Sequence, residues 1–239
     1  MSNDKEFQKW IEESLEKVRK KKARLEKTEI REAAVQYASG RKSDGYTIED
    51  YYALPDERRV ELIDGVFYDM GAPASLHQLF AGEFYRVIKH YIKKHKGKCI
   101  PLISPVDVQL NCDNRTMVQP DVMIVCDRSK VIRRCVYGAP DFVIEILSPS
   151  TKKKDMGKKL QKYMDAGVHE YWIVDPEQKR VLVYDFSTEN YPAIYGFEDE
   201  IPIGLYGGDL RIDMKEVYGE AEFLYEDDLY EDDLCEENK

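Results

Sequence analysis

Apolar residues recur along the chain at two different spacings, one typical of helices and one typical of buried strands. Between residues 75 and 96 they return every three or four positions and form one broad apolar face, which predicts a long helix capped by Ser75. A short continuous apolar run, as at 142–147, instead predicts a strand buried on both faces. Two β-rich runs at 60–63 and 66–70 flank an Asp-Gly pair, so this segment predicts a hairpin with a two-residue turn.

The order of these elements along the chain predicts the fold class. A hairpin, a helix, several strands, a second helix and two more strands indicate an α/β fold of the mixed α+β type, with a central mixed sheet and helices on the sheet faces. The further strands are expected at 99–103, 106–110, 118–126, 171–174 and 181–184, and the further helices at 47–54 and 155–166.

We divide the chain into three parts. Residues 1–40 predict a charged helix whose narrow apolar stripe suits a partner or a second copy of the chain, which is compatible with a homodimer. After a linker rich in serine and glycine, residues 46–213 form the folded domain. Residues 214–239 form an acidic tail that we expect to be disordered.

The distribution of charge matters more than its sum. A formal net charge of −10 argues by itself against a nucleic acid partner. However, residues 220–237 contain ten acidic and no basic side chains, so the remainder of the chain is formally neutral. Lysines gather in two clusters that either meet a phosphate backbone or are simply solvated. The clusters are Lys89, Lys93, Lys94, Lys96 and Lys98, and Lys152, Lys153 and Lys154.

The cysteines and the apolar runs bear on the compartment. Five scattered cysteines lack the spacing of a zinc or redox motif. No apolar run is long enough to span a bilayer, and the charged N-terminus has no secretory signal. We therefore expect a cytoplasmic protein without membrane contact, with reduced thiols and with Cys99 and Cys126 in the core.

Two carboxylates stand where the apolar pattern predicts buried strands. Asp121 follows a proline at the beginning of one strand, and Glu145 lies among apolar neighbours in another. A buried ionised carboxylate is costly unless it is paired, so Glu145 either pairs with a lysine or arginine or shares a cation with Asp121. Because Mg²⁺ prefers oxygen ligands, the second alternative predicts the core of a site that cuts phosphodiesters.

Three further side chains are candidates for the same site. Lys159 flanks the apolar face of the helix at 155–166, and it is either solvated or able to orient a water and stabilise developing negative charge. His77 lies within the apolar arc of the long helix, as a hydrogen-bonded core histidine or as a general base. Glu61 in the hairpin is either a further acid of the cluster or exposed to solvent.

Several segments occur together in the order of a known family. They are residues 61–65, 119–121, 145–151, 159–163 and 167–176, together with His77. Over about residues 46–212 the chain resembles the Uma-two-like family of restriction endonuclease domains, which belongs to the PD-(D/E)xK nuclease superfamily.

This resemblance implies a restriction-endonuclease-like core with a Mg²⁺ site at Asp121 and Glu145, where Mn²⁺ can substitute. The carbonyl of Ile146 would be a further ligand. The superfamily's usual lysine, two positions after the second acid, is replaced here by Leu147. The resemblance assigns its role to Lys159 on the following helix.

We therefore expect a Mg²⁺-dependent endonuclease, a hydrolase that cuts phosphodiester bonds in DNA. Asp121, Glu145 and Lys159 are the expected catalytic residues, and Glu61 and His77 are the accessory ones. The alternative is a catalytically degenerate nuclease fold that binds nucleic acid or a protein partner. The leucine at position 147 favours this alternative, and the two intact acids oppose it.

Overall fold

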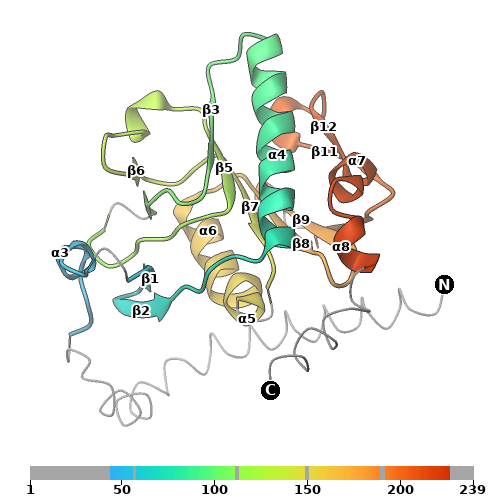
Figure 1. Cartoon of the computed structure of the whole chain (residues 1–239). Helices are drawn as coiled ribbons and strands as arrows, with labels where there is room; N and C mark the ends of the chain where they lie inside the picture. The colour runs from blue at the N-terminus through green and yellow to red at the C-terminus, as the bar shows by residue number, and fades with distance from the viewer. Residues whose placement is uncertain (1–43, 56–57, 111–112, 149–150, 189–191, 227–239) are drawn as a thin grey trace, which may run out of the picture. The chain divides into compact units, whose positions relative to one another are not determined.

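The computed structural model separates the chain into two units, Met1–Tyr46 and Thr47–Lys239. The helix expected at 1–40 lies outside the described residues, so that expectation stays a prediction. None of the helices described is long and apolar enough to cross a membrane. The structure describes residues 44–55, 58–110, 113–148, 151–188 and 192–226 (Figure 1).

A six-stranded mixed sheet forms the centre of the second unit. Its order is β10-β9-β8-β7-β5-β3, in which β7 and β8 run parallel and all other neighbours run antiparallel. The predicted α/β class with a mixed central sheet is confirmed. The six strands are β3 (Ile100–Ile103), β5 (Val122–Val125), β7 (Phe142–Ile146), β8 (Glu170–Asp175), β9 (Arg180–Asp185) and β10 (Ala193–Gly196).

Helices cover both faces of this sheet. The long helix α4 (Ser75–Lys94) lies across one face (Figure 1), where its Phe84 packs in one apolar cluster with Phe142 and Ile144 of β7. Side chains alternate along a strand, so Val143 and Glu145 of β7 point to the other face. There Tyr163 of α6 (Leu160–Ala166) bonds to Glu145.

Two helix ends follow clear local sequence signals, and the start of α4 does not. Thr47 and Asp50 form a capping box at the start of α3 (Ile48–Tyr52). Gly167 ends α6 in the left-handed conformation, at a φ of 87°. In α4 the expected cap Ser75 is instead the first helical residue, and the preceding Ala74 offers no side-chain cap.

The segment predicted as one helix at 155–166 is interrupted. The helix starts before the expected bound as α5 (Lys152–Lys154), widens into the π-helical turn η3 (Asp155–Lys159), and continues as α6. Such turns occur frequently at functional sites. The turn contains two buried charged side chains, Asp155 and Lys159.

The predicted hairpin is present as β1 (Val60–Ile63) and β2 (Val66–Asp69). Its turn residues Asp64 and Gly65 have φ values of 52° and 76°, as a two-residue hairpin turn requires. A bridge from Leu62 to Met117 attaches β1 to the segment that leads into β5. The remaining short elements are β4 (Val108–Gln109), η2 (Arg128–Lys130), β6 (Val136–Tyr137), β11 (Glu200–Pro202), η4 (Gly204–Tyr206) and β12 (Arg211–Asp213).

The folded domain extends into the segment expected to be a disordered tail. Residues 214–226 form α7 (Met214–Gly219) and α8 (Phe223–Glu226). Met214, Val217 and Ala221 recur three and four positions apart and are buried in the main apolar cluster. The boundary expected at 213 is therefore too early. The rest of the tail lies outside the described residues.

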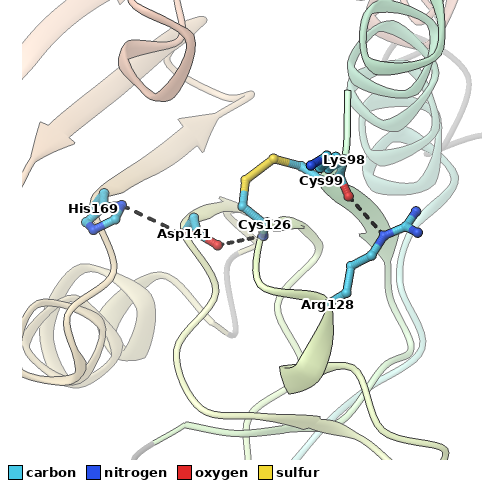
Figure 2. The surroundings of a disulfide bond; sticks show 6 residues. All are labelled: Lys98, Cys99, Cys126, Arg128, Asp141 and His169. Carbon is cyan, nitrogen blue, oxygen red and sulfur yellow. Dashed lines mark hydrogen bonds and ion pairs between the residues drawn. A yellow bond between two sulfur atoms is a disulfide. The ribbon is translucent and has the colours of Figure 1, made fainter. Parts of the chain in front are cut away.

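The expectation of reduced thiols at Cys99 and Cys126 is wrong, because these two residues form a disulfide (Figure 2). Cys99 precedes β3 and Cys126 follows β5, and the antiparallel register that pairs Ile100 with Val125 places them opposite each other. The bond ties the edge strand β3 to the sheet. For a separation of 27 residues, the loss of chain entropy in the unfolded state corresponds to about 3–4 kcal/mol of stability.

Candidate active site

The strand register brings the two predicted acids together. Val122 of β5 lies opposite Ile144 of β7, so one step further along the antiparallel pair Asp121 lies opposite Glu145. Opposite side chains share a face of the sheet, with Cβ atoms about 5 Å apart. Both acids are buried, with exposures of 8% and 3%. The backbone N–H of Ile146 donates to Oδ2 of Asp121 at 2.7 Å, which holds this carboxylate at the strand end.

Lys159 lies at the centre of the acids and not in solvent. Its Nζ forms ion pairs with Oε1 of Glu145, with Oε1 of Glu61 at 2.9 Å and with Oδ1 of Asp155 at 3.6 Å. The side chain is 2% exposed. The structure therefore excludes the solvated alternative for Lys159 and places its ammonium group against one of the two predicted metal ligands.

Glu61 belongs to the same cluster. Its side chain is fully buried, so the alternative of solvent exposure is excluded. Lys154 pairs with Oε2 at 2.5 Å, and the backbone N–H of Gln119 donates to Oε1 at 3.1 Å. The hairpin reaches this position because β1 bridges to the segment before β5. Glu61 thereby orients both lysines of the cluster.

His77 reaches the site from the first turn of α4. Its Nε2 lies 3.1 Å from Oδ2 of Asp121, the same oxygen that accepts from Ile146. Its Nδ1 is buried without a hydrogen-bond partner among the described residues. Burial lowers the pKa of His77, but its hydrogen bond to Asp121 and the negative charge of that carboxylate outweigh burial and raise the pKa above the usual value. A charged His77 would neutralise part of the charge on Asp121.

Burial and neighbouring charges shift the pKa values of the cluster in different directions. Burial raises the pKa of Glu145 well above its usual value, and Lys159 offsets only part of this effect. Burial also opposes ionisation of Glu61, but Lys159 and Lys154 lower its pKa to about 2. Burial disfavours the charged form of Lys159, yet the surrounding carboxylates raise its pKa well above the usual range. Lys159 thus remains charged, while Glu145 is the group poised to take up a proton.

Three members of the cluster were not assigned to it by the sequence. The Tyr163 hydroxyl donates to Oε1 of Glu145 at 2.6 Å, and burial raises the pKa of Tyr163 well above its usual value, so it remains a donor. Asp155 is 2% exposed beside Lys159. The i, i+4 stripe of Asp155, Lys159 and Tyr163 was the available signal. The sequence contained no comparable signal for Lys154, because this residue belongs to a run of three lysines.

Two of the lysines expected to meet a phosphate backbone are engaged within the protein. Lys154 pairs with Glu61, and Lys152 pairs with the buried Asp175 at 3.2 Å. Their charges are therefore largely balanced internally. The lysines of the other cluster, near the end of α4 and directly after it, are exposed, so this cluster remains available for a phosphate contact.

The donor set of the site fits a hard cation completed by other ligands. Oε1 of Glu145 pairs with the ammonium group of Lys159 and accepts a hydrogen bond from Tyr163. The other oxygen of Glu145, Oε2, has no hydrogen bond to any described residue, and the same is true of Oδ1 of Asp121. Within the described residues no three His, Cys, Asp or Glu side chains are arranged to hold a metal alone. Mg²⁺ characteristically uses one or two carboxylates together with water and substrate phosphate, so two free carboxylate oxygens suffice.

The Ile146 carbonyl is the third ligand that the sequence predicts. Within a strand, the N–H and C=O of one residue point to the same side. Because the Ile146 N–H points at Asp121, its carbonyl lies on the side of the two acids. The backbone orientation is therefore compatible with the predicted ligand role.

Comparison with known proteins places this chain in a family. A sequence profile of the Uma2 family, described as "putative restriction endonuclease", matches residues 48–204, which is more than half of the chain. The chain belongs to the Uma2 family. The family resemblance seen in the sequence is thereby confirmed, and Asp121, Glu145 and Lys159 all lie inside the matched region.

Two relatives of this Uma2 protein illustrate how far the likeness extends. An uncharacterized protein, slr1290 of Synechocystis sp., is 26% identical over 155 residues, which cover 61% of this chain and 80% of the relative. A crystal structure of a "putative nuclease belonging to DUF820" from Anabaena variabilis superimposes with a TM-score of 0.62 at 20% identity. The match covers 73% of this chain and 98% of the other. This likeness confirms the restriction-endonuclease-like fold.

Proposed function

We propose that this Uma2 protein is a Mg²⁺-dependent endonuclease that hydrolyses phosphodiester bonds in DNA. The observation that supports the proposal best is the meeting of Asp121 and Glu145 across β5 and β7, with the ammonium group of Lys159 paired to Glu145. The leucine at position 147 is no obstacle, because Lys159 supplies a cation at the acids from the following helix. Membership in a family described as restriction endonucleases supports the same reaction class.

The proposed chemistry assigns a task to each residue. Asp121, Glu145 and the Ile146 carbonyl would hold Mg²⁺, which lowers the pKa of a bound water and neutralises phosphate charge. Lys159 would orient the attacking water and stabilise the charge that develops on the phosphate oxygens. Tyr163 and Glu61 keep Glu145 and Lys159 in place through their hydrogen bond and ion pair. His77 fixes the orientation of Asp121.

Metal-dependent cutting is the direct test. Purified protein incubated with plasmid and with single-stranded DNA should cut at least one of them in Mg²⁺ or Mn²⁺ and neither in chelator. Tight DNA binding without cutting in either metal would contradict the proposal and identify the degenerate nuclease fold as the better description. Cutting that persists in chelator would show that the acids do not act through a metal.

Metal binding can be measured without cleavage, through the melting temperature. The folded-state pKa of Glu145 is raised, so the stability that its protonated form contributes is present below the unfolded pKa and is lost as pH rises through the folded value. Ionised Glu145 is the metal ligand, so Mg²⁺ should stabilise the protein more at about pH 8 than at about pH 6. At a concentration ten times Kd the gain is roughly 1.4 kcal/mol, or about 3–6 °C in Tm.

A control at equal ionic strength with Na⁺ removes the general effect of salt on charged groups. The Glu145→Gln variant should lose the Mg²⁺-dependent shift, because an amide is a weak ligand for this ion. A shift of equal size in that variant, or one that does not change with pH, would show that Mg²⁺ binds elsewhere.

A further inference from the structure

A pocket lies directly beside the carboxylate cluster. Its volume is about 360 Å³, within the range of small-ligand pockets. Gln119 connects the two sites, since its side chain lines the pocket while its backbone N–H donates to Glu61. Ser104, next to the lining residue Pro105, donates its N–H to the carbonyl of Asp121 at 2.9 Å. A group in this pocket would therefore lie close to whatever is bound at Asp121.

The lining of the pocket combines apolar side chains with two exposed arginines. The segment 128–134 contains four basic residues and no acidic ones. Arg133 and Arg134 line the pocket and are exposed, and neither forms an ion pair with a described residue. Ile132 between them and the η2 turn is 48% exposed. The apolar lining residues are Leu102, Pro105, Val106, Val131, Ile132 and Val136.

Asp107 supplies a hydrogen-bond acceptor inside the pocket. Its Oδ1 accepts from the Tyr51 hydroxyl at 2.8 Å and from the Gln119 amide at 2.9 Å. Its Oδ2 has no hydrogen bond to any described residue. The Oε1 atom of Gln119 accepts from Arg59 at 3.3 Å and, as a neutral amide oxygen, is a weaker acceptor than the carboxylate of Asp107. The pocket therefore offers a free carboxylate oxygen to a ligand that donates a hydrogen bond.

This arrangement of groups matches one nucleotide. A nucleobase fits between apolar walls, the exocyclic amino group of cytosine, adenine or guanine donates to a carboxylate, and a phosphate meets arginine at the mouth. We propose that the pocket binds an unpaired nucleotide of the DNA strand being cut. The base enters between the apolar walls, its amino group donates to Asp107, and its phosphate contacts Arg133. The inference rests on the proposed function and deepens it by naming the substrate as DNA with an unstacked base beside the cut.

Binding without cleavage tests this pocket separately from the nuclease reaction. Fluorescently labelled single strands of about 12 nucleotides, within the usual site size for such strands, are titrated in chelator and followed by anisotropy. We expect oligo-dC to bind roughly 10-fold more tightly than oligo-dT, as one good base contact provides. A strand of abasic sites should bind at least as weakly as oligo-dT.

Two surface variants and two matched controls locate the effect. Ile132→Trp blocks the pocket mouth and should equalise the affinities for oligo-dC, oligo-dT and the abasic strand. Its control, Ile194→Trp, changes an exposed isoleucine on the opposite edge strand β10 and should leave the preference intact. Arg133→Glu should weaken all strands and lower the salt slope by about one. Its control Lys215→Glu reverses a charge on α7 and should have little effect.

The Asp107→Asn variant is nearly isosteric and retains one acceptor oxygen. It should reduce the preference for oligo-dC over oligo-dT, because a neutral amide is a weaker acceptor than a carboxylate. Equal affinity of the wild-type protein for abasic and oligo-dC strands would overturn the pocket. So would an unchanged preference in Ile132→Trp. If the preference is found but no DNA is cut with any metal, the pocket stands and the nuclease proposal fails.

Discussion

Replacement of Glu145 by glutamine is expected to reduce Mg²⁺-dependent cleavage roughly 10²–10³-fold or more, the size found when a preorganised charge-stabilising group is removed from an active site. The substitution keeps the shape of the side chain and its neighbour Tyr163, but removes the negative oxygen that Mg²⁺ requires. Because burial already favours the neutral form of Glu145, the variant should remain folded. Single-turnover cleavage of a labelled oligonucleotide measures the loss.

A suitable control is the other buried glutamate of the sheet. Glu170 of β8 is 4% exposed and accepts a hydrogen bond from Trp172 at 2.6 Å, on the face away from the cluster. Glu170→Gln should lower the melting temperature through that bond while it leaves cleavage per folded molecule near wild type. Equal losses in the two variants would indicate that Glu145 acts on stability alone. Cleavage retained by Glu145→Gln would remove Glu145 from the mechanism.

The elements with strong periodicity were predictable from the sequence. The Asp-Gly hairpin, the long helix and the strands around Glu145 and Trp172 each have several local signals that agree, and each occurs within a few residues of its expected bounds. The sequence also predicted that Asp121 and Glu145 meet, and it left open that Glu145 pairs with a lysine. The structure shows both, because the register of β5 on β7 joins the acids and Lys159 pairs with Glu145. Their catalytic role remains a prediction.

The features that escaped prediction depend on contacts between distant segments. The Cys99–Cys126 bond follows from the register of β3 on β5, which the spacing of the cysteines does not reveal. The helix at 214–219 is buried through tertiary contacts although its sequence is rich in charge. The partner of Lys154 is Glu61, 93 residues away, and no local pattern distinguishes this lysine from its neighbours. Local sequence signals therefore predicted helices and strands better than they predicted which distant side chains contact each other.

The π-helical turn explains how a displaced lysine can serve these acids. A π turn adds a residue to the helical turn, so η3 changes the direction of the side chains that follow α5. Within this turn, Asp155 and Lys159 are both buried, and Nζ of Lys159 lies 3.6 Å from Oδ1 of Asp155. The ammonium group thus approaches Glu145 from the helix that covers this face of the sheet, and position 147, directly after β7, is left to an apolar residue.

Replacement of Lys159 by methionine is expected to affect both stability and cleavage. It leaves Glu61, Glu145 and Asp155 buried without the cation that pairs with all three. Breaking a buried ion pair by removal of one partner costs about 3–5 kcal/mol. Lys162→Met, on the same helix, removes a pair with the exposed Asp64 and should cost no more than about 1 kcal/mol. Denaturant titration of both variants measures the difference.

The pH dependence separates this electrostatic effect from a loss of packing. Without Lys159, the folded-state pKa values of all three carboxyl groups rise. Those of Glu145 and Asp155 move further above their unfolded values, and that of Glu61 rises from about 2. The deficit of Lys159→Met should then be largest at neutral pH and shrink as the pH falls toward about 5 and the carboxyls take up protons. A deficit that is constant with pH would indicate packing. Cleavage per folded molecule should still fall at least about 10²-fold, because protonation of the carboxyl groups restores stability but does not replace the ammonium group. If the folded variant instead cleaved at the wild-type rate, Lys159 would be a purely structural residue.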